Sequence, residues 1–331
     1  MNLEVAICSP VVREALHDSL LALEGIEPSL IAPGDLPDAA LAADVLVLSG
    51  TNYSRELAQA LESADRRCRW LLLLSAGYEL LEQYGVSPSV RVANAGSVWS
   101  PVVAEHTMAL LLALARRLPA AFAAQTRSRW DDTIRREMGA LTASTLVIVG
   151  MGSIGGEVAR RARAFGMTII GVSRSGRSHA DADRMYPVSE LREALAQADF
   201  VVVALPLSSG TKGIIGAGEL AACASHVSLV NVGRGPVVDS VALEQALKAG
   251  VILGAGLDVT DPEPLPADSA LWQLPNVIIT PHLGGAAPAQ YYRRLTEHVT
   301  RNVSAIAAGT QIRDLVDTSG FAHPRSQGES R

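Results

Sequence analysis

The apolar residues of this chain gather in short uninterrupted runs, and the segments between the runs have helical spacing. In the first third of the chain the runs are Val5–Ile7, Val45–Leu48 and Trp70–Leu74. Runs of this length without polar alternation are typical of parallel strands whose two faces are both covered. Between them, Ser54–Ser63 places Leu57 and Leu61 on one helical face. The pattern therefore predicts alternating strands and helices.

From Ser144 onwards the same alternation is denser. The expected strands are Thr145–Val149, Thr168–Val172, Phe200–Ala204, Ser228–Val232, Ile252–Asp258 and Val277–Thr280. Helical patterns such as Ser189–Ala198 separate most of them. A strand–helix–strand rhythm at this spacing predicts a doubly wound parallel sheet, so the expected fold class is α/β.

Two longer helices are expected outside this rhythm. Gly96–Leu118 reads as one helix, with Ser100 as a good N-cap and Pro101 in the first helical position. We expect it to carry the chain from one lobe to another. A last helix covers about 287–308, and the polar segment 317–331 that follows is expected to be a disordered tail.

Composition narrows the class of protein. A length of 331 residues suggests about two domains, and a hydrophobic content of 48% is enough for a large buried core. Lys and Arg together number 28, against 34 Asp and Glu, which gives a formal charge of −6. This balance argues against nucleic acid as the main partner and fits a soluble enzyme.

Neither a targeting segment nor a metal site is expected. The start, MNLEVAICSP, lacks a basic region followed by a long apolar stretch. Thr107–Ala115 is very apolar but far short of the roughly 20 residues of a membrane span, so we expect a buried helix. Cys8, Cys68 and Cys223 lack the spacing of a disulfide framework or of metal ligands, and we expect thiols in a reducing compartment. The expected location is the cytoplasm, with no membrane partner.

A glycine-rich turn follows the first strand of the second half. Gly150, Gly152 and Gly155 have G-x-G-x-x-G spacing after an apolar strand and open a helix, with Ser153 and Ile154 in its first turn. Glycines at these places permit a tight turn, approach of backbone amides to a pyrophosphate and close packing of helix on strand. The turn therefore predicts a dinucleotide site, and the alternative is a purely structural turn.

The end of the next strand sets the expected choice of cofactor. Such units usually place an acid there, about 20 residues on, to hold a ribose hydroxyl. This chain instead has Ser173, Arg174, Ser175 and Arg177. A hydroxyl followed by a guanidinium suits a 2′-phosphate, so we expect NADP(H) to be preferred, with NAD(H) possible. The alternative is that the arginines are solvated loop charges and the protein is NAD-linked or indifferent.

Three polar side chains stand at the ends of three later strands. Arg234 lies in the glycine-flanked turn of LVNVGRGPVVD, Glu263 in GLDVTDPEPLP and His282 in NVIITPHLGG. Ligands bind beyond the carboxyl ends of strands in an open parallel sheet, so all three should face one crevice. Reduction of a 2-keto acid needs a proton donor, which a histidine oriented by a carboxylate provides, and an arginine for the substrate carboxylate. Each residue alone has an ordinary structural explanation.

Four stretches of the chain carry a family resemblance: AGSVWSPVVAEHTMALLLALAR, VGMGSIG, NVGRGPVVD and GAGLDVTDPEPLPADSALWQLPNVIITPH. They resemble, in the same order, motifs of the D-isomer-specific 2-hydroxyacid dehydrogenases, and the resemblance covers essentially residues 1–316. It implies that Arg234, Glu263 and His282 are the catalytic arginine, glutamate and histidine.

The resemblance also implies further contacts. Asp258 matches the acid that meets the nicotinamide carboxamide. The backbone around Ala76 and Gly77 matches a loop that grips the substrate carboxylate, and Arg234 and His282 are implied to bind the substrate too. The other implied cofactor contacts are Leu205, Pro206, Thr211, Val232, Gly233 and Gly284.

The family implies a layout of two lobes, each a parallel sheet flanked by helices. A flavodoxin-like substrate lobe takes 1–98 and 285–316, and a Rossmann-type cofactor lobe, 99–284, is inserted between them. Family members are commonly dimers joined through the cofactor lobe, so a homodimer is implied, with Arg127–Asp132 where an arm between subunits would lie.

Departures from branches of the family narrow the substrate. The phosphoglycerate branch has an arginine where this chain has Leu48 and Ser49, and the phosphite branch has a lysine where it has Ala76. The formate branch pairs its histidine with glutamine, whereas Glu263 is present here. The serine–arginine–serine segment looks like the NADP-using glyoxylate/hydroxypyruvate reductase branch. We expect reduction of a small unphosphorylated 2-keto acid to the D-2-hydroxy acid. The alternatives are a corepressor-like NAD(H)-sensing protein and a dehydrogenase of another small anion.

Overall fold

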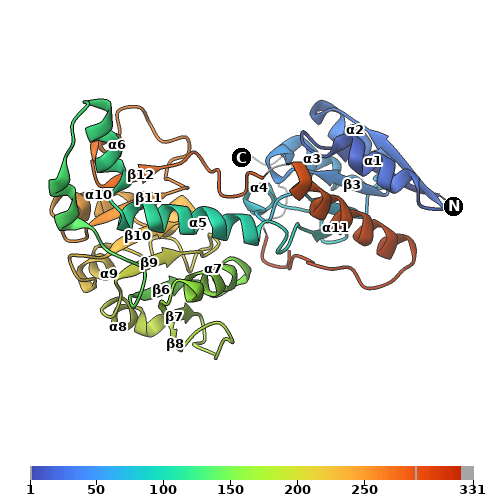
Figure 1. Ribbon diagram of the computed structural model, residues 1–331. Helices are drawn as coiled ribbons and strands as arrows, with labels where there is room; N and C mark the ends of the chain where they lie inside the picture. The colour runs from blue at the N-terminus through green and yellow to red at the C-terminus, as the bar shows by residue number, and fades with distance from the viewer. Residues whose placement is uncertain (1, 288, 322–331) are drawn as a thin grey trace, which may run out of the picture. The chain divides into compact units, whose positions relative to one another are not determined.

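The computed structural model describes residues 2–287 and 289–321, and the chain in it divides into two compact units. Unit 1 takes Met1–Trp99 and Ala287–Arg331, and unit 2 takes Ser100–Ala286 (Figure 1). Unit 2 is thus one uninterrupted stretch inserted into unit 1.

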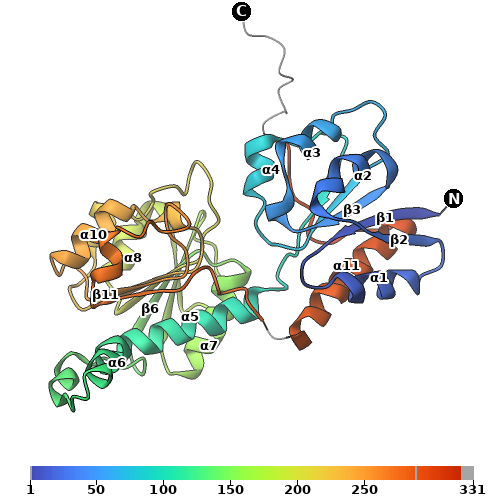
Figure 2. The same ribbon diagram turned by 90° about the horizontal axis from the view of Figure 1, so that it is seen from above.

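Unit 1 is a parallel five-stranded sheet in the order β2-β1-β3-β4-β5. Its strands are β1 (Leu3–Cys8), β2 (Ile26–Leu30), β3 (Val45–Leu48), β4 (Trp70–Leu73) and β5 (Arg91–Ala93). Its helices are α1 (Arg13–Leu21), α2 (Leu36–Ala42), α3 (Arg55–Ala60), α4 (Glu79–Tyr84) and α11 (Ala289–Ala307). One face of the sheet packs on α1 and α11, and the other on α2, α3 and α4 (Figure 2). This strand order is that of flavodoxin-like folds.

Unit 2 is a parallel seven-stranded sheet in the order β12-β11-β10-β9-β6-β7-β8. Its strands are β6 (Thr145–Val149), β7 (Thr168–Ser173), β8 (Arg184–Pro187), β9 (Phe200–Val203), β10 (Ser228–Asn231), β11 (Gly254–Leu257) and β12 (Val277–Ile279). Its α-helices are α5 (Ser100–Ala115), α6 (Leu118–Thr126), α7 (Ser153–Ala164), α8 (Leu191–Leu195), α9 (Ala217–Ala222) and α10 (Ser240–Lys248). Helix α5 packs on β10, β11 and α7. Helices α8, α9 and α10 share a hydrophobic core with the strands of the sheet. The predicted α/β class with two helix-flanked parallel sheets is confirmed.

Three strands were missing from the sequence prediction, and all three are edge strands. These are β2, β5 and β8, each at one end of its sheet. Only one side of an edge strand carries a neighbour, so the strand tolerates polar residues and proline. Pro28 lies inside β2, where exposed and less exposed residues alternate, and Arg91 and Arg184 begin β5 and β8. The apolar runs that mark the central strands are therefore absent.

The expected single helix over 96–118 is wrong in its extent. Gly96 has a φ of 52°, and the helix begins only at Ser100. It ends at Ala115, where Arg117 adopts a left-handed φ of 53°, and α6 starts with Pro119 in its first turn. No described helix is by itself long and apolar enough to cross a membrane, although α5 and α6 taken together, with a 67° bend, pass on length and composition alone.

The end of unit 1 returns along β5. Ala93 pairs antiparallel with Leu315, and the amide of Val316 donates to the carbonyl of Val92. Phe321 then stacks on Tyr78 with ring centroids 5.6 Å apart. Of the tail predicted to be disordered over 317–331, residues 322–331 lie outside the described part of the chain.

Candidate active site

The predicted site residues of unit 2 stand along one edge of its sheet, where the parallel strands end. Gly150 follows β6, Ser173 ends β7, Leu205 follows β9, Arg234 follows β10, Asp258 follows β11 and His282 follows β12. The strand order reverses between β6 and β9, and that reversal is where open α/β sheets bind their ligands.

The glycine turn after β6 has the geometry of a phosphate cradle. Gly150 has a φ of 108°, and a Cβ there would lie 2.8 Å from the carbonyl oxygen of Ala204. A Cβ on Gly155 would collide with the carbonyl of Gly150, whereas one on Gly152 would meet open space. Helix α7 starts at Ser153, and the amides of 153–155 donate to no acceptor among the described residues. Free amides around an open glycine at a helix N-terminus fit a pyrophosphate.

The turn after β7 is fixed internally while its arginines point to solvent. The amide of Gly176 donates to the Ser173 hydroxyl at 3.2 Å. Gly176 has a φ of 64°, and a Cβ there would lie 2.7 Å from the nitrogen of Pro187. Arg174, Ser175 and Arg177 are exposed, and the two arginines form no ion pair within the described chain. This leaves two guanidinium groups available beside the cradle.

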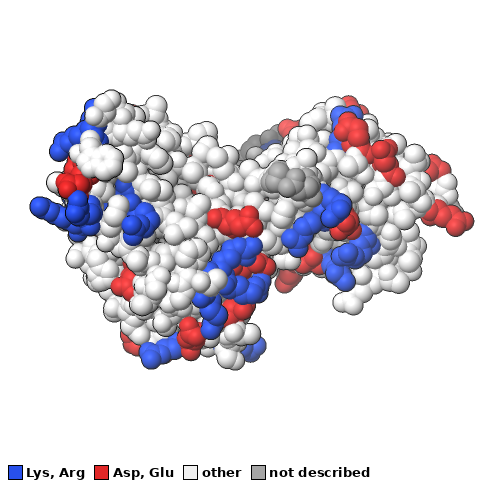
Figure 3. Space-filling view, viewed as in Figure 1, with Lys and Arg blue, Asp and Glu red and all other residues white. Residues whose placement is uncertain are grey.

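The arginines of the neighbouring helix α7 behave differently. Arg160 pairs with Glu157 and with Asp181 at 3.0 Å, and Arg161 pairs with Glu157. Basic and acidic side chains are likewise interspersed on the face drawn in Figure 3. The unpaired arginines of the β7 turn therefore stand out from the ion pairs of α7.

The loop after β9 lies directly against the loop after β10. A Cβ on Gly233 would come within 2.5 Å of the carbonyl oxygen of Leu205, so only glycine fits. The Thr211 hydroxyl donates to the carbonyl of Pro206 at 2.7 Å and braces this loop. The amide of Val232 continues the ladder to the carbonyl of Val203 at 3.0 Å. The expected cofactor contacts Leu205, Pro206, Thr211, Val232 and Gly233 thus form one braced segment.

Asn231, which the sequence analysis did not single out, fixes the turn that carries Arg234. It is buried at the end of β10, accepts a bond from the amide of Gly233 and donates to the carbonyl of Arg234, each at 3.1 Å. Arg234 itself donates to the carbonyl of Gly233 at 2.8 Å. A Cβ on Gly235 would collide with the carbonyl of Thr260, so the turn packs against the loop that leads to Glu263.

Glu263 and His282, far apart in the sequence, are brought together. Nδ1 of His282 lies 3.2 Å from Oε2 of Glu263, and the two side chains are 48% and 42% exposed. A carboxylate accepts and does not donate, so the proton between the two sits on Nδ1. His282 has a left-handed φ of 52°, and its amide donates to the carbonyls of Asp258 and Thr280. The turn therefore aims the ring while its backbone is tied to β11.

Asp258 is the anchor of that turn. Its carboxylate is buried and accepts bonds from the amides of Leu283 and Gly284, each at 2.8 Å, and from the Thr280 hydroxyl at 2.7 Å. Burial alone would raise the pKa of Asp258, but bonds from His106, Thr280, Gly284 and Leu283 outweigh it and lower the pKa to about 2. A Cβ on Gly284 would lie 2.7 Å from Oδ2, which explains the glycine.

Ala76 and Gly77 belong to unit 1, whereas the other site residues belong to unit 2. They follow β4 in a loop whose carbonyls are all bound. The Asn94 amide donates to the carbonyl of Ala76 at 2.7 Å, and the Ser75 hydroxyl donates to that of Gly77 at 2.8 Å. The amides of Ala76 and Gly77 donate to no acceptor among the described residues. Two adjacent free amides are suited to an anion.

Three aromatic residues of unit 1, Tyr53, Trp99 and Tyr291, make internal contacts. Tyr53 is buried and donates to the carbonyl of Gly85 at 2.6 Å. Trp99 donates to the carbonyl of Leu74 at 3.0 Å and stacks on Tyr291.

Within the described residues there is no cluster of His, Cys, Asp and Glu side chains that could hold a metal ion.

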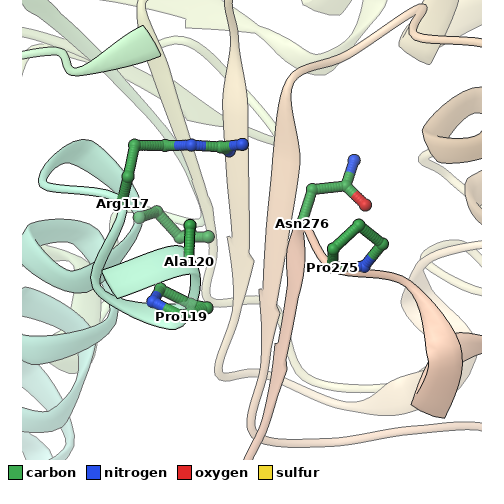
Figure 4. A pocket seen from close by; sticks show the side chains of 6 residues that line it. Arg117, Pro119, Ala120, Pro275 and Asn276 are labelled. Carbon is green, nitrogen blue, oxygen red and sulfur yellow. The ribbon is translucent and has the colours of Figure 1, made fainter. Parts of the chain in front are cut away.

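A small hollow of unit 2 lies at the opposite edge of its sheet and is not part of this site. It separates the end of α5 and the start of α6 from the segment that precedes β12 (Figure 4). Its lining residues are Leu114, Arg117, Pro119, Ala120, Pro275 and Asn276.

The sequence profile of the D-isomer specific 2-hydroxyacid dehydrogenase NAD-binding domain matches residues 108–284. The chain belongs to this family. Its profile match spans the phosphate cradle, the Arg234 turn, Glu263 and His282. As a D-2-hydroxyacid dehydrogenase, the chain is an NAD(P)-dependent oxidoreductase that acts on small 2-hydroxy or 2-keto acids.

Relatives of this dehydrogenase differ in their substrates. Glyoxylate/hydroxypyruvate reductase B of Yersinia pestis is 33% identical over 313 residues, 92% of this chain and 90% of the relative. D-3-phosphoglycerate dehydrogenase of Methanocaldococcus jannaschii is 36% identical over 285 residues, but the chain covers only 53% of its length. An NADPH-dependent glyoxylate/hydroxypyruvate reductase from Sinorhizobium meliloti, solved with NADP and sulfate, has a TM-score of 0.80 at 26% identity, covering 97% of this chain and 100% of that one.

Proposed function

We propose that this dehydrogenase uses NADPH to reduce a small unphosphorylated 2-keto acid, of the glyoxylate or hydroxypyruvate kind, to the D-2-hydroxy acid. The observation that carries the proposal is the His282–Glu263 pair, with Nδ1 and Oε2 3.2 Å apart, on the same sheet edge as Arg234. A proton donor oriented by a carboxylate beside a guanidinium is the set that carbonyl reduction requires.

The three side chains have separate roles in this scheme. A nicotinamide held by unit 2 would supply the hydride that reduces the carbonyl carbon. His282 binds the carbonyl oxygen through its Nε2–H group and donates the Nε2 proton to that oxygen, which yields the hydroxyl. Glu263 accepts from Nδ1, so it orients the ring and leaves Nε2 to face the substrate. Arg234 binds the substrate carboxylate and polarises the carbonyl.

Unit 2 is proposed as the cofactor lobe, and the β7 turn as the source of the NADPH preference. Asp258 is proposed to face the nicotinamide carboxamide in addition to holding its turn. Arg174 and Arg177 are exposed and unpaired among the described residues, so they are available to a 2′-phosphate. An acid in place of Ser173 would repel that phosphate, and none is present. The relative from Sinorhizobium meliloti, described as NADPH-dependent, is consistent with this preference.

Unit 1 is proposed as the substrate lobe. The free amides of Ala76 and Gly77 would bind the substrate carboxylate together with Arg234. The neighbouring segment after β3 supports an unphosphorylated substrate, because Leu48 is buried and the Ser49 hydroxyl pairs with that of Thr51 at 3.0 Å. Neither residue offers a cation for a phosphate.

A homodimer is proposed to form through unit 2. The segment after α5 exposes large apolar side chains, with Phe122 59% and Trp130 96% exposed. Clusters of this kind mark protein contacts, and the family resemblance places an arm between subunits at Arg127–Asp132. Analytical ultracentrifugation should give a dimer for the natural chain and a monomer for the double variant Phe122→Ser, Trp130→Ser. A monomeric natural chain would refute the proposal.

One kinetic panel tests the function. Glyoxylate, hydroxypyruvate, pyruvate and longer 2-keto acids are each offered with NADPH and with NADH. The expected result is turnover of the small keto acids, with a higher kcat/KM for NADPH. Tight cofactor binding without turnover of any keto acid would favour the corepressor-like alternative. Turnover with equal kcat/KM for both cofactors would refute the NADPH preference alone.

A further inference from the structure

Helix α5 packs closely along β11, with two glycines and then Asp258 opposite successive turns of the helix. A Cβ on Gly254 would lie 3.5 Å from Leu114, and one on Gly256 would lie 3.3 Å from Leu110. The next position of the strand, Asp258, meets the next turn of the helix, where Nε2 of His106 lies 3.2 Å from Oδ1. Two strand residues and one helical turn of four residues both advance by about 6 Å, so the two spacings stay in step.

The contact between His106 and Asp258 is polar, and it also includes Thr280, two residues before His282. The Thr280 hydroxyl donates its proton to Oδ1 of Asp258 at 2.7 Å. Its oxygen lies 2.9 Å from Nε2 of His106, and because that hydroxyl proton is already committed, Nε2 is the donor. His106 thereby supports both the hydroxyl and the carboxylate.

The supported carboxylate in turn holds the residues that follow the proposed proton donor. Its two oxygens accept from the consecutive amides of Leu283 and Gly284, and the backbone carbonyl of Asp258 accepts from the amide of His282. Three successive amides thus converge on one residue. His282 itself is held at a φ of 52°, a conformation that costs an L-residue free energy unless its surroundings impose it.

We propose that His106 is a positioning residue for His282, which it holds in place through Thr280 and Asp258. The inference rests on the proposed function for its effect on catalysis, but not for its effect on the turn. Nε2 of His106 is engaged by Thr280 and Asp258, so the scheme proposed above gives His106 no chemical step of its own.

Hydrogen exchange of the protein without cofactor tests the structural half. His106→Leu removes the donor at similar volume, Thr280→Val removes the relaying hydroxyl, and His106→Gln restores an N–H donor. Exchange at the amides of Leu283 and Gly284, followed by mass spectrometry, is expected to accelerate about tenfold in the first two variants and to return towards the natural rate in the third. Unchanged exchange in both His106→Leu and Thr280→Val would overturn the proposal.

The control variant is His226→Leu. His226 also pairs with an aspartate, Asp199, at 2.9 Å, but both precede strands β10 and β9 and so lie at the opposite edge of the same sheet. Its loss should leave exchange at Leu283 and Gly284 unchanged. Acceleration equal to that of His106→Leu would mean a general loosening of unit 2 and would also overturn the proposal.

Steady-state kinetics tests the catalytic half. His106→Leu should lower kcat about tenfold, because the ring of His282 is misaimed, while the Kd of NADPH stays within about twofold. His106→Gln should recover most of kcat. If the natural chain turns over no 2-keto acid, the proposed function fails while the exchange result still decides the role of His106. If turnover is present and kcat of His106→Leu is unchanged, the positioning role is refuted.

Discussion

In each unit one polar side chain, which we call the hub, fixes a loop of the candidate site. The hub is the carboxylate of Asp258 in unit 2 and the carboxamide of Asn94 in unit 1. In unit 2, the turn of His282 presents amides, and a buried anion, Asp258, accepts from them. In unit 1, the groups to be fixed are the carbonyl of Ala76 and the amide of Gly96. Asn94 does both, since its Nδ2 donates to the carbonyl of Ala76 at 2.7 Å and its Oδ1 accepts from Gly96 at 2.9 Å.

A histidine from a long helix supports each hub. His106 of α5 contacts the Asp258 carboxylate, and Nε2 of His298 of α11 lies 3.0 Å from the backbone carbonyl of Asn94. The two hubs differ because the backbone groups that they bind differ. The side chain in unit 2 only accepts, which suits a carboxylate, whereas Asn94 donates to the Ala76 carbonyl and accepts from the amide of Gly96, which requires a carboxamide. The hub of unit 2 is therefore charged, whereas the hub of unit 1 is a neutral carboxamide.

The largest effect is expected from His282→Asn, in the turn that the charged hub of unit 2 holds. Loss of the proposed proton donor should lower kcat about a thousandfold, while the Kd of NADPH changes by no more than about twofold. Stopped-flow and fluorescence titration measure the two quantities. His226→Asn serves as the control and should retain full activity. Undiminished turnover in His282→Asn would remove the assignment of the donor.

The next test concerns the arginines of the turn after β7, on the same edge of the sheet. Arg174→Ala should raise the KM for NADPH by up to about a hundredfold and leave the KM for NADH nearly unchanged, because a charge-assisted contact to the 2′-phosphate is lost. The difference should shrink at high salt. Arg160→Ala, which removes an arginine of the ion pairs on α7, should leave the cofactor ratio as it is. An equal loss for both cofactors in Arg174→Ala would contradict the prediction.

A reciprocal pair of substitutions exchanges the two kinds of hub, and Asp258→Asn is the first. The folded pKa of Asp258 is about 2 against an ordinary 3.8. Because the folded pKa is the lower one, this carboxyl contributes stability that is complete above its ordinary pKa and is lost as the pH falls towards 2. As the pH falls, protonation of Asp258 should lower the free energy of unfolding of the natural chain by about 2 kcal/mol. Asp258→Asn has no carboxyl at this position, so its stability should lack this dependence on pH.

Urea unfolding of both proteins between about pH 5 and pH 2 measures this difference. The stability of the natural chain relative to Asp258→Asn should fall as the pH falls. A constant difference across the range would show that the carboxylate gains nothing from its four donors.

Asn94→Asp is the second member of the pair and should have the smallest effect. A carboxylate can still accept from Gly96 but cannot donate to the carbonyl of Ala76, so the Ala76–Gly77 amides lose their alignment. The KM for the keto acid should rise about tenfold, with kcat and the Kd of NADPH little changed. Ser75→Ala, which frees the carbonyl of Gly77, should raise the same KM. A fall in kcat alone would place Asn94 elsewhere in the mechanism.

The sequence predicted the central strands and the order of the polar residues at their ends, because buried parallel strands leave continuous apolar runs. It did not predict β2, β5 and β8, which lie at the ends of their sheets and contain proline or arginine in place of such a run. The pairing of Glu263 with His282 was expected from chemistry and resemblance, and the structure brings the two side chains together. Their roles stay predictions.

The hubs could not be predicted, since each depends on strand register. Asp258 reaches the His282 turn because Leu257 pairs with Ile279 across β11 and β12, and a polar side chain bonded across such a pair has no periodic signature. Asn94 was missed for the same reason, whereas Asn231 bonds only within the turn that follows its own strand. One signal was readable in retrospect. Gly254, Gly256 and Asp258 alternate along β11, and Leu114, Leu110 and His106 recur every four residues along α5.

The uninterrupted course of unit 2 has a consequence for how such a protein changes over generations. Its first helix and its last turn are neighbours, since a Cβ on Gly284 would lie 3.6 Å from Val103. A segment whose two ends meet can be exchanged by recombination at only two points, without redrawing the rest of the gene. The unit that contains the glycine turn can thus be exchanged whole between relatives, while unit 1 keeps its own evolutionary history.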